Sequence, residues 1–182
     1  MKRKIDEIKT LYHGTGIYHE QIDLNRSAPL KDFGRGYYVT SYWLQASNWA
    51  RRKGEASWIF QYELAPVPNE MKIRELLQYD EEWLDFIVSH RLRGKDTDFD
   101  IVYDRMADNR FDKLSQAIHD YSVGRIAAQR ALHVIRFNRD NRDQYCFKTP
   151  QAVALLKRSH TYRLRNGRWS EWNETEGNFY DP

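Results

Sequence analysis

Cysteine and proline are scarce in this sequence, whose 182 residues include one cysteine, Cys146, and five prolines. A single cysteine excludes an internal disulfide framework and a multi-cysteine zinc site, and it fits a reducing compartment. Long apolar runs are lacking too. Because acidic residues rather than an apolar stretch follow the basic N-terminus, we expect neither a signal peptide nor a membrane span. These absences favour a cytoplasmic protein.

Runs of one charge and linkers rich in proline, glycine and serine are also missing, and the formal net charge is only +3. One compact domain over residues 1–182 is therefore expected. Aromatic side chains make up 14% of the chain and charged ones 30%, a combination that indicates a folded protein. The six histidines are scattered, and no group of ligand residues has the spacing of a metal site.

Segments with strand and helix patterns interleave without regular βαβ units, which favours an α+β fold. The predicted strands lie near Leu11 and at 37–40, 57–64, 99–103 and 144–148, and a hairpin at about 160–172 turns at Asn166-Gly167. The predicted helices begin at Thr40 or Ser41, Asp80, Asp112, Arg125 and Thr149-Pro150. Their expected apolar stripes include Tyr42, Ala46, Trp49 and Ala50 in the first helix, Trp83, Leu84, Ile87 and Val88 in the second, and Ala152, Val153 and Leu156 in the last.

Two glycine-containing motifs stand in the first quarter of the chain. His13-Gly14-Thr15 ends the first predicted strand, and alone it fits a histidine satisfied at a strand end beside a turn glycine. The second motif is Gly34-Arg35-Gly36-Tyr37-Tyr38, which a helix carrying Ala46 and Trp49 follows. It is not a Rossmann fingerprint, since no third glycine follows at the required offset and a strand comes next.

In this order and spacing, the two motifs resemble the donor-binding region of the diphtheria-toxin-like and poly(ADP-ribose)-polymerase-like ADP-ribosyltransferase superfamily. They are similar to a bacterial branch that is found beside small antitoxin-like genes. The resemblance implies a split β core of two small packed sheets with flanking helices, and NAD⁺ as co-substrate in a cleft between them. It also implies mono-ADP-ribosyl transfer to an unidentified macromolecular acceptor by a bacterial toxin or effector, with a small cognate antitoxin as a further partner.

The same resemblance gives individual residues a role in donor binding. His13 would contact the adenosine ribose, and the backbone of Gly14 would pair with the nicotinamide carboxamide. Tyr38 and Trp49 would cover the two faces of nicotinamide, where a cationic ring gains cation–π attraction of ~1–2 kcal/mol. Core packing is the alternative for Trp49. The implied cofactor-binding set is His13, Gly14, Thr15, Arg35, Gly36, Tyr38 and Trp49, in which Arg35 is either a donor to the diphosphate or a solvated turn residue.

The catalytic residues that the resemblance implies are His13, Tyr38 and Gln144. Gln144 stands where the family has a catalytic glutamate, and Ala46 stands where it often has a serine. Because the transfer passes through an oxocarbenium-like transition state, a neutral amide cannot supply the charge of a carboxylate, although it can hydrogen-bond the ribose 2′-hydroxyl. The carboxylates that could substitute are Asp100, Asp104, Asp108 and Asp143, for which capping of helices and turns is the alternative.

Two other functions remain open from the sequence. A catalytically silent NAD⁺-binding or interaction domain would keep the donor motifs and lack the carboxylate. A basic nucleic-acid-binding module would use the cations and aromatic rings near the C-terminus, which the solvated face of a hairpin explains equally well. These side chains are Lys157, Arg158, His160, Tyr162, Arg163, Arg165, Arg168 and Trp169.

Overall fold

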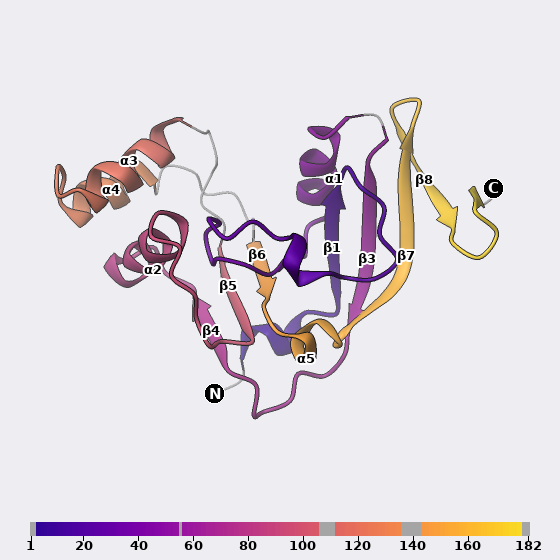
Figure 1. The fold of residues 1–182 in the computed structure, drawn as a ribbon, viewed down its shortest axis with the longest axis horizontal. Helices are drawn as coiled ribbons and strands as arrows, with labels where there is room; N and C mark the ends of the chain where they lie inside the picture. The colour runs from indigo at the N-terminus through magenta and orange to yellow at the C-terminus, as the bar shows by residue number, and fades with distance from the viewer. Residues whose placement is uncertain (1–2, 55, 106–111, 136–142, 180–182) are drawn as a thin grey trace. The chain divides into compact units, whose positions relative to one another are not determined.

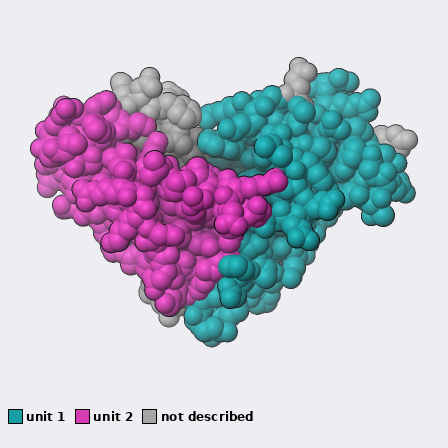
Figure 2. Space-filling view, viewed as in Figure 1, with its two compact units in different colours: residues 1–22, 38–71, 150–182 teal, residues 23–37, 72–149 magenta. Residues whose placement is uncertain are grey.

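A computed structural model of the chain describes residues 3–54, 56–105, 112–135 and 143–179. The fold class is α+β, as predicted, with helices and strands interleaved along the chain and two separate sheets (Figure 1). The chain divides into two compact units, which Figure 2 shows in different colours. The first unit comprises residues 1–22, 38–71 and 150–182, and the second comprises residues 23–37 and 72–149.

The sheet of the first unit is antiparallel throughout. Its strands, in spatial order, are β1 (Thr10–Thr15), β3 (Trp58–Leu64), β7 (Leu156–Arg165), β8 (Arg168–Asn173) and β9 (Asn178–Phe179). The predicted hairpin is present between β7 and β8. Asn166 and Gly167 have φ angles of 47° and 75°, the left-handed values that a two-residue type I′ turn requires. The short strand β9 follows the hairpin and was not predicted.

Helix α1 (Trp43–Arg51) packs on one face of this sheet through small side chains. Ala46 and Ala50 form a buried cluster with Ile59 of β3, and four partly buried rings surround the cluster. The predicted stripe is wrong at Tyr42 and Trp49, whose side chains are 41% and 44% exposed. Because the helix lies so close to the sheet, only small residues fit between them, and the large rings turn outward. The predicted cap is wrong too, since the residue before the helix is Tyr42, without a side-chain cap.

The second sheet contains both parallel and antiparallel pairs. Its order is β2 (Tyr37–Val39), β6 (Asp143–Phe147), β5 (Ile101–Arg105) and β4 (Ile73–Leu76), with β6 antiparallel and β4 parallel to β5. Four successive residues of β5, 101–104, are buried, so both of its faces are covered. Strand β4 was not predicted, because its charged centre, Arg74-Glu75, hides the apolar pattern of an edge strand.

The helices of the second unit are α2 (Glu81–Arg91), α3 (Asp112–Ser122) and α4 (Ala128–Ile135). Asp80 caps α2, since its carboxylate accepts a 2.9 Å hydrogen bond from the Trp83 amide. The predicted stripe of α2 is confirmed, with all four side chains buried. In the first unit, α5 (Pro150–Val153) is shorter than predicted because Leu156 already belongs to β7. Two 3-10 turns, η1 (Lys4–Glu7) and η2 (Leu24–Arg26), complete the described elements named here.

Candidate functional site

His13 of the first motif and Tyr38, the last residue of the second motif, lie close together in the first unit. Strand β1 exchanges backbone hydrogen bonds with Thr40, two residues after the second motif, from Tyr12 N to Thr40 O at 2.7 Å and from Thr40 N to Tyr12 O at 2.9 Å. The imidazole Nδ1 of His13 lies 2.7 Å from the carbonyl oxygen of Tyr38. A carbonyl only accepts, so Nδ1 is the donor, and Nε2 is the acceptor nitrogen of the neutral ring. The tertiary structure thus brings His13 and Tyr38 together.

Gly14 has a packing role that the sequence analysis did not assign. A Cβ atom at this position would lie 2.1 Å from the carbonyl oxygen of Ala46 and 3.2 Å from the Cβ of Ala50. Only glycine therefore lets α1 approach β1 so closely. Ala46 therefore lies at this contact, while the hydroxyl of the neighbouring Ser47 accepts a 2.7 Å hydrogen bond from the Trp169 indole. Ser47 is therefore engaged in holding the C-terminal hairpin.

The segment after the first motif contacts side chains of β3 and β7. The ring of His19 lies 4.3 Å from that of Phe60 and 5.8 Å from that of His13, between centroids. Arg158 of β7 donates a 2.7 Å hydrogen bond to the His19 carbonyl and stacks 4.3 Å over the Phe60 ring. An ion pair of 2.9 Å with Glu174 orients the same guanidinium. Within the motif, the Thr15 hydroxyl accepts from the Ile17 amide at 3.2 Å and shapes the turn.

The Gly34-Arg35-Gly36 turn belongs to the second unit, and Lys148 stabilises it through hydrogen bonds. The side chain of Lys148 is 4% exposed, and its ammonium donates to the carbonyl oxygens of Phe33 and Arg35 at 2.6 and 2.7 Å. A Cβ at Gly36 would lie 2.3 Å from the Cys146 sulfur, so glycine is required for this close approach. This role of Lys148 was not predicted, because a lysine at the end of a strand is ordinarily solvated.

Arg35 is exposed in this turn. Its guanidinium donates to the carbonyl oxygens of Asn25 and Ser27, at 3.4 and 3.0 Å, and its side chain is exposed. These bonds fix the loop that contains η2. The loop in turn supports the glycine turn, since the Ser27 hydroxyl accepts from the Gly36 amide at 3.2 Å.

Gln144 lies in a group of carboxyl side chains in the second unit. The antiparallel register of β5 and β6 pairs Gln144 with Asp104, and the Gln144 amide donates a 3.2 Å hydrogen bond to Asp32. The Asp32 carboxylate is 26% exposed and lies 3.5 Å from the guanidinium of Arg91. A glutamate at position 144 would add a third carboxyl group and remove the donor. An amide at position 144 therefore suits this group of carboxyl side chains better than an acid would.

Asp104 is the most perturbed acid of this group. It is 1% exposed, and its Oδ2 accepts a 2.8 Å hydrogen bond from the Trp83 indole. Among the described residues, nothing hydrogen-bonds to its Oδ1. Burial raises the pKa of Asp104 to about 8, and the nearby charges of Asp32 and Asp143 act in the same direction, whereas the Trp83 and Gln144 donors oppose it. At neutral pH most of this carboxyl group is therefore protonated.

The other acids that could substitute for the family glutamate have different surroundings. The Asp100 carboxylate accepts hydrogen bonds from the Lys72 amide at 2.9 Å and from the Thr149 hydroxyl at 2.7 Å, so it ties segments together as an ordinary capping residue does. Asp143 begins β6 beside Gln144. Asp108 lies outside the described residues.

Trp49 lies on the outer face of α1 in the first unit. Its indole is 44% exposed, and the Lys53 ammonium and the Arg52 guanidinium lie 5.4 and 5.9 Å from the ring centroid. In the ranges that the structure covers, no three potential ligand side chains form a metal site. No helix in those ranges is long and apolar enough to cross a membrane.

The comparisons with known proteins identify a family and no individual relative. Neither a curated protein nor a solved structure matches the chain. The family described as "Protein of unknown function (DUF3990)" matches residues 9–158, a range that contains both glycine motifs, Asp104 and Gln144. Because this match covers far more than half of the 182 residues, the chain belongs to the DUF3990 family.

Proposed function

We propose that this protein is an NAD⁺-dependent mono-ADP-ribosyltransferase with the split β core of that superfamily, acting on a macromolecular acceptor as a bacterial toxin or effector. One observation carries the proposal: His13 and Tyr38, which are 25 residues apart and come from the two motifs that resemble a donor site, are joined by a 2.7 Å hydrogen bond. Residues that bind the same NAD⁺ molecule have to lie close together. A histidine and a tyrosine with unrelated structural roles would not need to be neighbours.

In the first unit, His13, Gly14 and Tyr38 have chemistry that suits the binding of NAD⁺. With Nδ1 donating to a carbonyl oxygen, a neutral His13 ring has an acceptor at Nε2, which is the chemistry that a ribose hydroxyl requires. The ring of Tyr38 is half-buried, and the resemblance assigns it to a face of nicotinamide. Thr15 shapes the loop that follows, and in the second unit Gly36, with Arg35, shapes the second turn.

We leave Trp49 out of the proposed donor site. Two cations, Arg52 and Lys53, already lie beside its ring. The pyridinium of NAD⁺ is itself a cation, so its approach to the same ring would be repelled. Replacement of Trp49 by alanine is therefore expected to leave NAD⁺ binding unchanged.

The transfer breaks the bond between ribose C1′ and the nicotinamide nitrogen. The electron pair of that bond leaves with neutral nicotinamide, the acceptor's lone pair forms the new bond to C1′, and the acceptor's proton passes to a base or to water. Positive charge develops on the ribose during this step. We assign the amide of Gln144 to the ribose 2′-hydroxyl, as the resemblance implies, and the negative charge to the Asp32 carboxylate that Gln144 contacts.

The test uses radiolabelled NAD⁺ and a bacterial lysate, and it follows nicotinamide release and label transfer. His13→Ala is compared with His160→Ala, which removes an exposed histidine from β7 of the same sheet. Tyr38→Ala is compared with Tyr42→Ala in the same way. Transfer by the wild type that is lost in His13→Ala and Tyr38→Ala, and kept in both controls, is the expected result.

Other outcomes separate the alternatives. NAD⁺ binding without nicotinamide release would identify a catalytically silent NAD⁺-binding domain. Release and transfer that survive in His13→Ala, while the variant stays folded, would contradict the donor site proposed here. Loss of transfer in Asp32→Asn with unchanged NAD⁺ binding is expected if Asp32 supplies the charge.

A further inference from the structure

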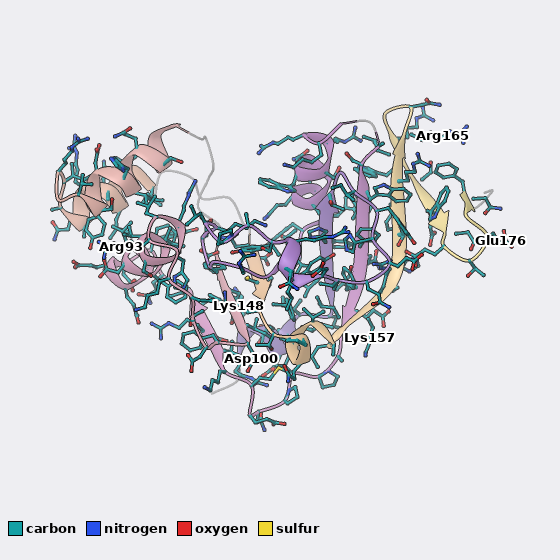
Figure 3. The ribbon with its side chains drawn as sticks, in the orientation of Figure 1. Arg93, Asp100, Lys148, Lys157, Arg165 and Glu176 are labelled. Atoms are coloured by element: carbon teal, nitrogen blue, oxygen red, sulfur yellow. The ribbon has the colours of Figure 1, made fainter. Side chains whose placement is uncertain are left out.

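Four exposed cations gather at one end of the first unit, and we call them the tip patch: Arg51, Lys53, Arg165 and Arg168. Arg51 and Lys53 end α1 or follow it, and Arg165 and Arg168 flank the turn of the β7–β8 hairpin, where Figure 3 shows Arg165 at the tip. A hydrogen bond joins the two elements, since the Arg51 guanidinium donates to the Gly167 carbonyl at 3.1 Å. The patch is therefore one surface drawn from distant parts of the sequence.

No carboxylate of the described residues forms an ion pair with these four cations. Elsewhere the protein pairs its cations closely, as between Arg158 and Glu174 at 2.9 Å or Lys72 and Asp98 at 2.7 Å. Positive charges that stay close together without counter-charges repel one another, and a polyanion relieves that repulsion. Its phosphates would release counterions from both partners on binding.

Aromatic rings are interleaved with these cations. Arg51 lies 5.6 Å over the Trp169 ring, Lys53 lies 5.4 Å over the Trp49 ring, and Trp49 is 44% exposed. An exposed indole can stack on a flat ring, and the neighbouring Lys53 ammonium can pair with a negative group attached to that ring. Single-stranded nucleic acid carries both groups in every nucleotide.

We propose that the tip patch binds single-stranded nucleic acid, with a base on Trp49 and phosphates on the four cations. The cations near the C-terminus, which suggested nucleic-acid binding in the sequence, fall into two groups in the structure. Arg158 and His160 form ion pairs with Glu174 and Glu171. Arg165 and Arg168 instead flank the turn whose Gly167 carbonyl accepts a hydrogen bond from Arg51 of α1. This binding goes beyond the proposed transferase and needs no NAD⁺. If both hold, nucleic acid is the class of acceptor.

The test measures fluorescence anisotropy of a labelled 12-nucleotide oligothymidylate as a function of salt. The patch variant has glutamine in place of Arg51, Lys53, Arg165 and Arg168. The control variant has glutamine in place of Lys9, Arg93, Lys95 and Lys157. Both carry the same net charge, and the control cations are exposed and lie elsewhere. We expect the patch variant to bind at least about 30-fold more weakly, with a salt slope reduced by about 2 to 3. The control should change less than about threefold.

Trp49→Ala separates stacking from charge. We expect it to weaken binding to the oligothymidylate about tenfold and to leave its salt slope unchanged, because the ring contacts a base and no phosphate. A duplex of the same length should bind more weakly than the single strand. Equal losses in the patch and control variants, equal affinity for the duplex, or full affinity in Trp49→Ala would each overturn the proposal. NAD⁺ binding by the same variants is measured in parallel, so failure of either proposal is recognised separately.

Discussion

Replacing Asp104 by asparagine tests the buried carboxyl group of the second unit quantitatively. The folded protein keeps this group 1% exposed and raises its pKa from 3.8 to about 8. In the unfolded chain the carboxyl is solvated and ionises at its ordinary pKa. Between these two values unfolding releases a proton, so the free energy of unfolding must fall as the pH rises.

The slope follows from the release of one proton, about 1.4 kcal/mol per pH unit. From pH 5 to pH 7, the wild type is expected to lose about 2.7 kcal/mol of stability through this group, and the loss levels off above the folded pKa of about 8. Asparagine has the same shape and still accepts the 2.8 Å hydrogen bond from Trp83, but it has no proton to release. The variant should therefore gain stability relative to the wild type as the pH rises.

The assay is urea denaturation of both proteins at pH 5, 6, 7 and 8. Subtracting the two free energies removes the contributions of every other titrating group. Asp98→Asn is the control, because that carboxylate is 77% exposed and a hydrogen bond from Lys72 lowers its pKa. Its difference from the wild type should stay level from pH 5 to 8. A level or opposite trend for Asp104→Asn would refute the assignment of a protonated acid.

Three further substitutions test other contacts by the same denaturation assay. Gly14→Ala should cost about 3 kcal/mol or more, because its Cβ would lie 2.1 Å from a backbone oxygen, and near-native stability would refute the close packing of α1. Lys148→Met should lower the free energy of unfolding by about 2 kcal/mol, since two carbonyl groups lose their donor. Lys95→Met, at an exposed lysine, should leave the stability unchanged. Equal effects of the two substitutions would argue that Lys148 does not hold the glycine turn. Gln144→Glu should cost about 2 kcal/mol at pH 7 and less at pH 5, because protonation relieves the crowded carboxyl groups, and a pH-independent cost would contradict that reason.

Local patterns predicted much of the fold where short-range chemistry decides it. The Asp80 cap followed by a buried stripe predicted α2, and Asn166-Gly167 predicted the β7–β8 turn, since both signals act within a few residues. Strand β4 was not predicted because its charged sequence lacks a strand pattern. Its pairing with β5, rather than its own sequence, stabilises it as a strand. Trp49 was misplaced because periodicity alone cannot tell which helix face meets a glycine on a neighbouring strand.

The candidate site was predictable in part. The sequence motifs selected His13 and Tyr38, and the structure brings them within a hydrogen bond of each other. Asp104 was among several acids that the sequence could not rank. Its pairing with Gln144 depends on the register of two strands whose partners are 40 positions apart. The fixing of the glycine turn by Lys148 likewise depends on tertiary packing alone.

Calorimetric titration of NAD⁺ into the wild type tests the donor site most directly. We predict saturable binding with one site per chain, weakened at least about tenfold in His13→Ala through loss of a hydrogen-bonding ring. His160→Ala should bind as the wild type does. Absence of binding by the folded wild type, or equal affinity of His13→Ala and the wild type, would contradict the account.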